Sequence, residues 1–412
     1  MRILSNDFGG YPYPMQLARA LAARGHTVCH TYCASLQTTP QGTMQRRPDD
    51  PAGLEVHPVR LDAPLEKYAF VTRWRQEREY GRKVTAVAAD FRPDVVLSAN
   101  TPLDAQGLLQ STARDQKAAF VFWLQDVIGI AAERILRQKL PVVGSWIGKH
   151  YVRMEARQLR TSDHVLMITE DFRPILRTWN VPDDRMSTVE NWAPVEELPL
   201  GDPASDWARE TGLDAAFVFL YAGTLALKHN PDLLLNLARQ TVGREVDGRP
   251  VRVLVLSQGP GADYLREHAA AEGLAHLDVR GFKPFAEMPE AMAAADVLVA
   301  VLEPDAGVFS VPSKVLAYLC GARPVLLAVP TENLAARIVA RHEAGRVVAP
   351  DDEAGFLAAA NDLMADADLR ARMGANARAY AEATFQIDGI ADAVERVLTD
   401  SVDRARATPP SR

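Results

Sequence analysis

The sequence predicts an α/β protein built from two doubly wound domains, and three observations support this prediction. Short apolar runs alternate with helical patterns along the chain, as expected for parallel sheets with helices on both faces. The alternation is interrupted once, at residues 193–215, which are rich in Pro, Gly and acidic residues. With 412 residues, the chain is long enough for a substantial core on either side of this interruption.

The first domain is expected over residues 1–192. It starts with a strand at Arg2–Ser5 and a Gly-rich loop, which lead into a helix over Met15–Arg24. Residues 36–53 are polar and contain Pro and Gly, so they predict a long loop, and the longest helix is expected over Phe70–Ala89. The other strands are expected at Thr27–Cys33, Val95–Ala99, Ala119–Leu124, His164–Thr169 and Thr188–Asn191.

The second domain is expected over residues 216–385, after a linker at 193–215. Helical patterns at Asp351–Asp366 and Asp368–Phe385 end this domain. Residues 386–412 are expected to form the end of a helix and a tail, frayed from residue 401. The strands of this domain are expected at Phe217–Tyr221, Val251–Leu256, Leu277–Val279, Asp296–Leu302, Pro324–Ala328 and Arg346–Val348.

Composition narrows the class of protein. Hydrophobic residues make up 48% of the chain and the net charge is −7, which disfavours nucleic acid as the main partner. The three cysteines, Cys29, Cys33 and Cys320, do not form a zinc-ligand pattern and are expected to be reduced thiols. No leader pattern and no membrane-length apolar run is visible, so we expect a cytoplasmic protein that can contact the inner face of the membrane.

The most informative motif is the stretch Ser310-Val-Pro-Ser-Lys314, which lies between a predicted strand and a predicted helix. Ser310 or Ser313 is expected to cap the helix, and Lys314 lies on its first turn. The dipole disfavours a cation at a helix N-terminus, so a lysine there indicates that a phosphate or diphosphate binds. A surface lysine on a capped helix is an equally consistent interpretation of this segment alone.

A second motif of the same kind follows the strand at Phe217–Ala222. Gly223-Thr224 turns the chain, and Lys228 precedes the next helical run. A small-residue turn lets the backbone approach a ligand, and the lysine adds positive charge beside it. Together, the two motifs predict a diphosphate at the carboxyl edge of a parallel sheet.

Several segments together resemble the family 4 retaining glycosyltransferases, whose GT-B fold has two Rossmann-like domains facing across a cleft. N-T-P-L at 100–103 and W-L-Q-D at 123–126 are similar to the branch that builds bacterial exopolysaccharides and O-antigens, including colanic-acid-type transferases. The segments that carry the resemblance are the Gly9-Gly10 loop, F-R-P-D-V-V at 91–96, Y-A-G-T…K at 221–228, G-F at 281–282 and P-S-K-V-L-A-Y-L at 312–319, followed by R-P-V.

The resemblance implies roles for individual residues. Lys228 and Lys314 would contact the donor diphosphate, and Asp126 would face the sugar and the acceptor; these are the candidate catalytic residues. Gly9 and Gly10 would approach the phosphate and sugar, Gly259 would lie beneath the nucleotide, and 281–283 would lie along the base. The candidate donor-binding residues are Gly9, Gly10, Gly223, Thr224, Gly259, Gly281, Phe282, Lys283, Ser310 and Ser313.

Two positions depart from the family pattern. Many relatives carry Arg directly after the glycine of the turn, where this chain has Thr224, so more of the positive charge falls to Lys228. Many also carry a Glu-x7-Glu pair, where this chain has Phe309 and Ala317. In the family, the second glutamate usually holds ribose hydroxyls. Glu303 is nearby in the sequence, but only its position suggests it for this role.

The chemistry expected is metal-free transfer from a nucleotide-diphosphate sugar, which is a substrate rather than a cofactor. A metal-type D-x-D motif occurs only at Asp366-Ala-Asp368, between two late helices, where solvated carboxylates are expected instead. A front-face route, in which the leaving phosphate helps to deprotonate the acceptor, is favoured over a nucleophilic carboxylate. Asp126 would orient the acceptor or stabilise the cation; its alternative role is to cap the following turn.

A basic segment that also contains apolar residues and the aromatic Trp146 lies between Arg134 and Arg160. It indicates contact with an anionic membrane and hence a lipid-linked acceptor, such as a sugar on a polyprenyl diphosphate. A solvated helix face, with these cations and those near Arg73 paired to Glu133, Glu77 and Glu79, is an equal alternative. The nearby Gly144-Ser-Trp-Ile-Gly148-Lys-His departs from a P-loop in spacing and lacks its Ser/Thr.

Two other functions remain open from the sequence. A nucleotide-sugar epimerase would give an epimer without any acceptor. A non-catalytic nucleotide-sugar-binding partner of another transferase, which the missing carboxylates motivate, would bind donor without turning it over.

Overall fold

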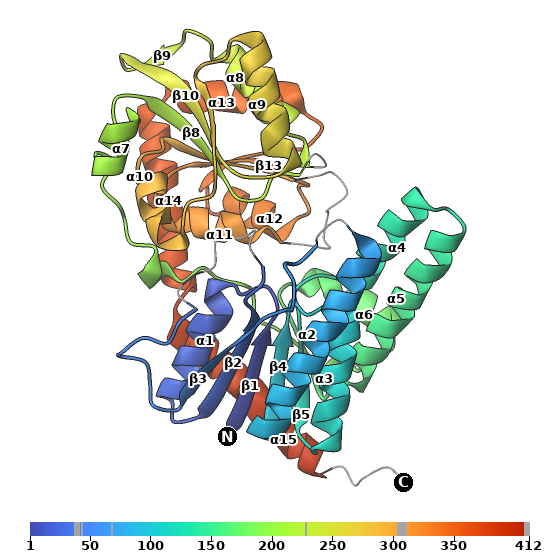
Figure 1. Cartoon of the computed structure of the whole chain (residues 1–412). Coiled ribbons are helices and arrows are strands. Elements are labelled where there is room, and N and C mark those ends of the chain that lie inside the picture. The colour runs from blue at the N-terminus through green and yellow to red at the C-terminus, as the bar shows by residue number, and fades with distance from the viewer. Residues whose placement is uncertain (37–41, 43, 67–68, 227–228, 303–310, 408–412) are drawn as a thin grey trace. The chain divides into compact units, whose positions relative to one another are not determined.

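Two parallel sheets organise the chain (Figure 1). The computed structural model describes all residues except 37–41, 43, 67–68, 227–228, 303–310 and 408–412. Unit 1 contains most of the chain up to Asn191 and, in addition, the C-terminal segment from Ile387; unit 2 contains Trp192–Gln386. The predicted class, two doubly wound α/β domains, is confirmed.

The sheet of unit 1 is entirely parallel, with strand order β3-β2-β1-β4-β5-β6-β7. The order reverses between β1 and β4, where Asp7 pairs with Ala99. Every residue of β4 and β5 is buried, which explains why their sequences are almost continuously apolar. The strands are β1 (Arg2–Asp7), β2 (Thr27–Cys33), β3 (Leu54–Val59), β4 (Val95–Ala99), β5 (Ala119–Leu124), β6 (His164–Met167) and β7 (Met186–Thr188).

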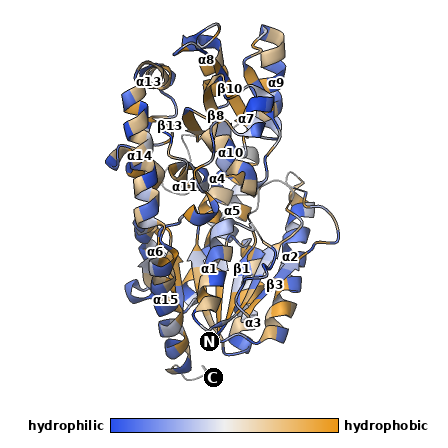
Figure 2. Cartoon of the chain, turned by 90° about the vertical axis from the view of Figure 1, so that its left-hand side faces the viewer, coloured by the Kyte–Doolittle hydropathy of each residue, from blue (hydrophilic) through white to orange (hydrophobic). Residues whose placement is uncertain are grey.

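Helices cover both faces of this sheet. On one face α1 (Pro12–Ala23) packs beside α15 (Ile387–Ala407), and on the other α2 (Phe70–Phe91) packs beside α3 (Leu103–Asp115) (Figures 1 and 2). Figure 2 shows the hydrophobic strands between helices whose outer sides are largely hydrophilic. The remaining helical elements are α4 (Ile128–Lys139), α5 (Val143–Thr161), η1 (Glu170–Phe172), α6 (Arg173–Thr178) and η2 (Asp183–Arg185).

The helix α15 completes unit 1 from the far end of the chain. Its apolar face buries Val394 and Leu398, and it contacts β4 and β5. At its N-terminal end, Asp388 and Asp392 each lie 3.1 Å from the guanidinium of Arg24, which follows α1. The C-terminal segment is therefore a structural layer of the first domain.

The sheet of unit 2 has the strand order β11-β10-β8-β12-β13-β14 and reverses between β8 and β12. These strands are parallel, while the short β9 pairs antiparallel with β10 through an Asp247-Gly248 turn in which both residues have positive φ. The strands are β8 (Phe217–Ala222), β9 (Glu245–Val246), β10 (Arg249–Leu256), β11 (Leu277–Arg280), β12 (Val297–Val301), β13 (Val325–Ala328) and β14 (Gly345–Val348).

The core of unit 2 forms where alternate residues of β8, such as Phe217 and Phe219, meet apolar side chains of α8, α9 and α13. The helix α11 packs against α14, β12 and β13. The helical elements are η3 (Val195–Glu197), α7 (Asp206–Thr211), α8 (Asp232–Gln240), α9 (Pro260–Glu272), η5 (Phe285–Glu287), α10 (Met288–Ala293), α11 (Ser313–Cys320), α12 (Leu334–Arg341), α13 (Glu353–Ala365) and α14 (Ala367–Thr384).

Three details differ from the sequence expectations. The sheet-edge strand β3 was not foreseen, because within Leu54–Val59 only the two end residues are buried and Pro58 is unusual in a strand. The segment 193–215 contains η3 and α7 and belongs to unit 2. The last helix continues to Ala407, beyond the point at which fraying was expected.

In the part of the chain that the structure describes, no helix combines the length and the hydrophobicity needed to cross a membrane.

The role of α15 gives a prediction for stability. Leu398 is fully buried, so Leu398→Ala should lower the free energy of unfolding by about 2–5 kcal/mol, measured by urea unfolding followed by circular dichroism. Arg396→Ala, an exposed site on the same helix, is the control and should change it little. Equal stability of the Leu398→Ala variant and the wild type would mean that α15 does not support the fold.

Candidate functional site

In unit 1, the reversal of strand order places Asp7 at the carboxyl edge of the sheet. Asp7 is fully buried and accepts three hydrogen bonds: from the amide of Gly9 (3.3 Å), the amide of Tyr11 (2.6 Å) and Nδ2 of Asn100 (2.8 Å). Gly10 has a φ of 64°, a conformation that glycine adopts without strain. The carboxylate thus shapes the loop between β1 and α1.

The predicted role of Gly9, close approach to a phosphate, meets an obstacle in this loop. A Cβ on Gly9 would lie 2.2 Å from Cε2 of Tyr11, so the tyrosine ring occupies the space over the glycine. The missing side chain at Gly9 therefore accommodates Tyr11, and the contact of Gly9 with a donor stays a prediction.

A chain of polar side chains continues along the same edge. Tyr13 donates to Oε1 of Gln125 (3.0 Å), and Nδ2 of Asn191 donates to the same oxygen (2.6 Å). Nδ2 of Asn100 lies 3.3 Å from the Tyr13 hydroxyl and so connects this group to Asp7. These side chains come from the ends of β1, β4 and β5, from the first turn of α1 and from the loop after β7, and they form one polar network at this edge.

Asp126 lies at this edge, directly after β5, and is exposed. Burial raises the pKa of the Tyr11 and Tyr13 hydroxyls, and the charges of Asp7 and Asp126 raise both further. The charge of Asp126 therefore acts on both tyrosines, and its own side chain is open to solvent.

The start of the helix after Asp126 is capped by Glu155, a residue that is distant in the sequence. Oε1 and Oε2 of Glu155 accept from the amides of Ile128 (3.0 Å) and Gly129 (2.8 Å), at the start of α4. Burial raises the pKa of this carboxyl to about 8, although the two amide bonds oppose the shift. Glu155 thus fixes α4 next to Asp126.

In unit 2, the reversal of strand order brings Lys314 of the first motif to the Gly223-Thr224 turn of the second. Nζ of Lys314, on the first turn of α11, donates to the hydroxyl of Tyr221 and lies 3.5 Å from the carbonyl oxygen of Thr224. It also lies 4.0 Å from the centre of the Tyr221 ring. The ammonium group is therefore held at the carboxyl end of β8.

Gly223 allows this approach. Its φ of 130° is disfavoured for other residues, and a Cβ on it would lie 3.2 Å from both Nζ and Cε of Lys314. Tyr318, on the buried face of α11, donates to the carbonyl oxygen of Ala222 (3.1 Å) and accepts from its amide (2.7 Å). The helix α11 is thus tied directly to the last residue of β8.

Of the two predicted caps of α11, Ser310 lies outside the described residues, and Ser313 lies inside the helix. Pro312 occupies the N-cap position, and because its backbone is extended the helix starts at Ser313, which makes no capping hydrogen bond. A residue at the first helical position cannot cap its own amide. Ser313 is nevertheless exposed at the N-terminus of the helix, next to Lys314. Ser310 and Lys228, like Glu303 and Phe309, lie outside the described residues.

The other predicted donor residues follow β10 and β11. Gly259 is the N-cap of α9, with a φ of 98°, and a Cβ on Gly281 would lie 3.1 Å from Nε2 of Gln258. The adjacent ends of these two strands therefore form one surface beside the Gly223 turn, because the amide of Gly261 donates to the carbonyl oxygen of Leu225 (3.1 Å).

The side chain of Lys283 has structural partners. Its Nζ lies 2.7 Å from Oε2 of Glu287 and 4.2 Å from the centre of the Trp207 ring. Phe282 is half-buried beside it. Contact of residues 281–283 with a nucleotide base stays a prediction, and this packing favours the backbone over the Lys283 ammonium as the contacting group.

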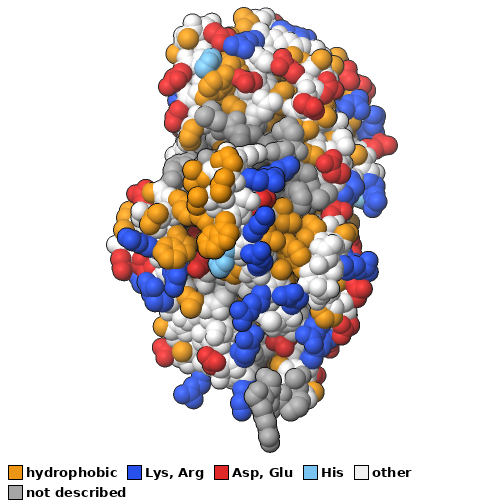
Figure 3. All heavy atoms as spheres, turned by 90° about the vertical axis from the view of Figure 1, so that its right-hand side faces the viewer, with side chains coloured by type: hydrophobic (Ala, Val, Ile, Leu, Met, Phe, Trp, Pro, Cys, Tyr) orange, Lys and Arg blue, Asp and Glu red, His pale blue; other side chains and the backbone are white. Residues whose placement is uncertain are grey.

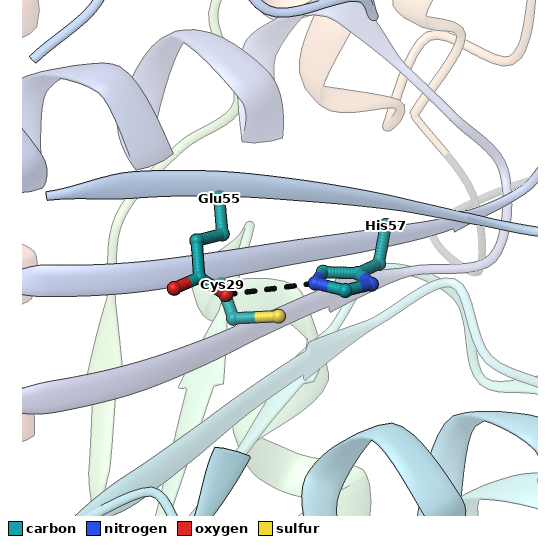
Figure 4. A group of neighbouring side chains, drawn as sticks. All are labelled: Cys29, Glu55 and His57. Carbon is teal, nitrogen blue, oxygen red and sulfur yellow. Dashed lines mark ion pairs between the residues drawn. The ribbon is translucent and has the colours of Figure 1, made fainter. Parts of the chain in front are cut away.

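One group of possible metal ligands occurs among the described residues: Cys29, Glu55 and His57, whose ligand atoms lie within 4.8 Å of one another (Figure 4). Burial raises the pKa of the Cys29 thiol to about 12, so the thiolate that a metal needs is disfavoured. His57 and Glu55 form an exposed pair, 3.5 Å apart, which accounts for their proximity. In the D-x-D segment, Asp366 caps α14 by accepting from the amide of Leu369.

The sequence interpretation missed several site residues. Asn100 lies in a quoted segment and Asp7 lies just before the Gly9-Gly10 loop, but only the fold shows that they share one hydrogen-bonded edge. Tyr221 and Tyr318 lie in quoted motifs but were given no role, yet their hydroxyls contact Lys314 and the end of β8. Their place at the end of a strand and on the first helix after the switch point was the available signal.

Family models match both units of this chain. The model described as "Glycosyl transferase 4-like domain" matches residues 8–192, and the one described as "Glycosyl transferases group 1" matches residues 216–366. The chain belongs to the family 4 glycosyltransferase superfamily. A search of curated proteins by sequence found no match.

Solved structures agree with this assignment at the level of the fold. The glycosyltransferase is similar to HepE from Anabaena, in complex with UDP and glucose, with a TM-score of 0.71 and 14% identity over 97% of this chain and 99% of that one. It is also similar to sucrose-phosphate synthase from Thermosynechococcus elongatus, with a TM-score of 0.72 and 16% identity over 98% and 100% of the two chains. The predicted GT-B fold is confirmed.

Asp7 gives a pH-dependent prediction. Burial raises its pKa from 3.8 to about 6, so its contribution to stability is fully present below the unfolded pKa and is lost as the pH rises through the folded one. Relative to Asp7→Asn, the wild type should therefore lose free energy of unfolding as the pH rises from about 4 to 7, measured by urea unfolding. Asp115→Asn, at an exposed site on α3, is the control. If the difference in the free energy of unfolding between the wild type and Asp7→Asn did not change with pH, the raised pKa of Asp7 would be contradicted.

Proposed function

We propose that the protein is a retaining, metal-independent glycosyltransferase that moves a sugar from a nucleotide-diphosphate sugar to a saccharide acceptor. The observation that supports this most is the ammonium of Lys314, held by Tyr221 against Gly223 at the switch point of unit 2. Ligands of open α/β sheets bind at such points. UDP is bound in the HepE structure, which has the same fold.

The donor diphosphate would lie at the N-terminus of α11. Ser313 and Lys314 are the first two residues of this helix, and its N-cap residue, Pro312, offers no side-chain acceptor for the helix amides. Free amides at a helix start and a nearby ammonium are suited to a diphosphate. Lys228, on the same turn as Gly223 and Thr224 in the sequence, would add a second cation.

The lysines and the amides at the start of α11 would assist the breaking of the bond between the sugar and the donor diphosphate. As the sugar–phosphate bond lengthens, positive charge grows on the sugar and negative charge on the leaving diphosphate. The ammonium of Lys314 and the helix amides stabilise that negative charge without reorganisation, because Tyr221 and Tyr318 already hold them in place. Cationic side chains can in this way do the work that a divalent metal does in other transferases.

Unit 1 would supply the acceptor side. Asp126 is exposed at the carboxyl edge of the sheet, directly after Gln125, whose side chain is held by the Tyr13 hydroxyl. We favour front-face transfer, in which a leaving phosphate oxygen accepts the acceptor proton and the acceptor oxygen bonds to the same face of the sugar. Asp126 then orients the acceptor or stabilises the sugar cation.

We further propose that the acceptor is lipid-linked, as a sugar on a polyprenyl diphosphate, in cell-surface polysaccharide synthesis. Two points support this part: the N-T-P-L and W-L-Q-D segments, and a fold shared with WaaG, a glycosyltransferase involved in lipopolysaccharide biosynthesis, at a TM-score of 0.62 and 16% identity over 97% of this chain and 100% of that one.

The first experiment is a thermal-shift screen against nucleotide diphosphates and their sugars, with and without EDTA. Stabilisation by one diphosphate, unchanged by EDTA, supports the donor site and its independence from metal. Turnover of the matching sugar with an acceptor then supports transfer, whereas an epimer formed without acceptor indicates an epimerase. Binding without any turnover indicates a non-catalytic partner.

Lys314→Ala tests the residue that supports the proposal most. The variant should lower kcat about 100- to 1,000-fold, because stabilisation of the leaving group is lost, while the Tm stays close to that of the wild type. The rate of transfer or donor hydrolysis measures the expected loss of activity, and the Tm measures whether the fold is kept. Lys228→Ala should behave in the same way.

Arg372→Ala, an exposed cation on α14, is the matched control and should retain wild-type turnover. Activity that survives Lys314→Ala would show that the site is misassigned. If the variant unfolds, Lys314→Gln, which keeps length and a donor, separates a loss of charge from a loss of fold.

A further inference from the structure

The connection between α4 and α5 exposes an unusual concentration of large apolar side chains. Val142 is 84% exposed and Trp146 73%, and half of the large hydrophobic residues that are exposed in the described chain lie within this short segment. Isolated exposed apolar residues are normal, but a contiguous group indicates a binding surface. We call this group the hairpin tip; it consists of Ile135, Leu140, Val142, Val143 and Trp146.

Close packing of the two helices leaves these side chains no interior to occupy. A Cβ on Gly144 would lie 1.9 Å from the carbonyl oxygen of Leu136, and one on Gly148 would lie 2.4 Å from Cα of Glu133. The helices therefore touch backbone to backbone near the tip. The glycines that resemble a P-loop in sequence thus serve helix packing, and the apolar side chains beside them must point outward.

A line of cations runs along α5 away from the hairpin tip. Lys149, Arg153 and Arg157 are spaced four residues apart, and Arg160 follows, so all four lie along one side of the helix; each is exposed. We call these four residues the basic stripe. Figure 3 shows hydrophobic side chains gathered beside a column of Lys and Arg on the side of the molecule to which α4 and α5 point in Figure 1.

The basic stripe differs from the other basic segment, on α2. There Arg73 lies 2.8 Å from Glu77 and Lys83 lies 2.7 Å from Glu79, so the expected pairing with acidic residues holds for α2. On α4, Arg137 lies 3.7 Å from Glu133. For the basic stripe, by contrast, the described part of the chain offers no carboxylate at ion-pairing distance. Its positive charge is uncompensated in a chain whose net charge is −7.

We infer that the hairpin tip inserts into the interface of an anionic lipid bilayer, with the basic stripe on the lipid headgroups. Trp and aliphatic side chains at the end of an element and Lys/Arg along its flank are the features of interfacial membrane binding. The inference deepens the proposed function, because a protein bound at the bilayer meets a lipid-linked acceptor there. It is argued only from the exposed side chains of the hairpin tip and the basic stripe, so it can be tested without measuring sugar transfer.

A second copy of the chain fits this surface less well. A symmetric contact between two tips would bring two uncompensated basic stripes together, and like charges oppose that association. An anionic bilayer instead neutralises the stripe while it removes the apolar tip from water. Charge complementarity therefore selects lipid as the occupant.

Sedimentation of the full-length protein with vesicles tests the inference. The protein should bind vesicles of equal parts phosphatidylcholine and phosphatidylglycerol, bind phosphatidylcholine alone more weakly, and release as salt increases. Val142→Asp should weaken binding about tenfold or more, because it places a charge in the interface. Arg153→Ala with Arg157→Ala should weaken it about fivefold per cation and reduce the salt dependence.

Val242→Asp is the matched control, since this valine is 58% exposed in unit 2 and should leave vesicle binding unchanged. Quenching of tryptophan fluorescence by brominated lipid should occur in the wild type and be reduced in Trp146→Phe. Failure to bind phosphatidylglycerol vesicles, or equal binding of Val142→Asp and the wild type, would overturn the inference. A dimer seen by light scattering that Val142→Asp dissociates, without vesicle binding, would assign the tip to a second copy instead. If Val142→Asp still binds the donor in the thermal-shift screen, a loss of vesicle binding concerns the membrane inference and not the proposed function.

Discussion

Parallel pairing brings the carboxyl ends of all strands in a sheet to one edge, and the chemistry of both units depends on this constraint. Where the strand order reverses, neighbouring loops diverge and leave room for functional groups. In unit 1 this position holds Asp7 and the polar side chains connected to it; in unit 2 it holds Lys314. Two buried-strand sheets thus place an acidic and hydroxyl-rich edge on one unit and a cationic edge on the other.

Both edges are rigid for the same physical reason. A polar group beside a buried strand must have partners, and these partners fix its geometry. Asp7 is held by two amides and Asn100, and the Lys314 ammonium by Tyr221 and the carbonyl of Thr224. Groups fixed before a ligand arrives need little reorganisation during a reaction, and this is the main electrostatic advantage that a protein offers.

Much of the fold was predictable because buried parallel strands are continuous apolar runs. The bounds of β2, β4 and β5 agree with the sequence, whereas β3, exposed along most of its length and containing Pro58, gave no such signal. For the site, the motifs indicated Lys314 and the Gly223 turn separately. Their contact, and the roles of Tyr221, Asp7 and Glu155, depend on side chains that are distant in sequence and meet only in the folded chain, so no local pattern encodes them.

The position of α15 has a consequence for how the protein folds in the cell. Translation delivers the seven strands of unit 1 first, but the helix that covers β4 and β5 leaves the ribosome only after all of unit 2. Domains ordinarily fold as units during synthesis, from the N-terminus onward. Part of one apolar face of the first sheet therefore stays uncovered until α15 has been synthesised, so the first domain is completed only after the second.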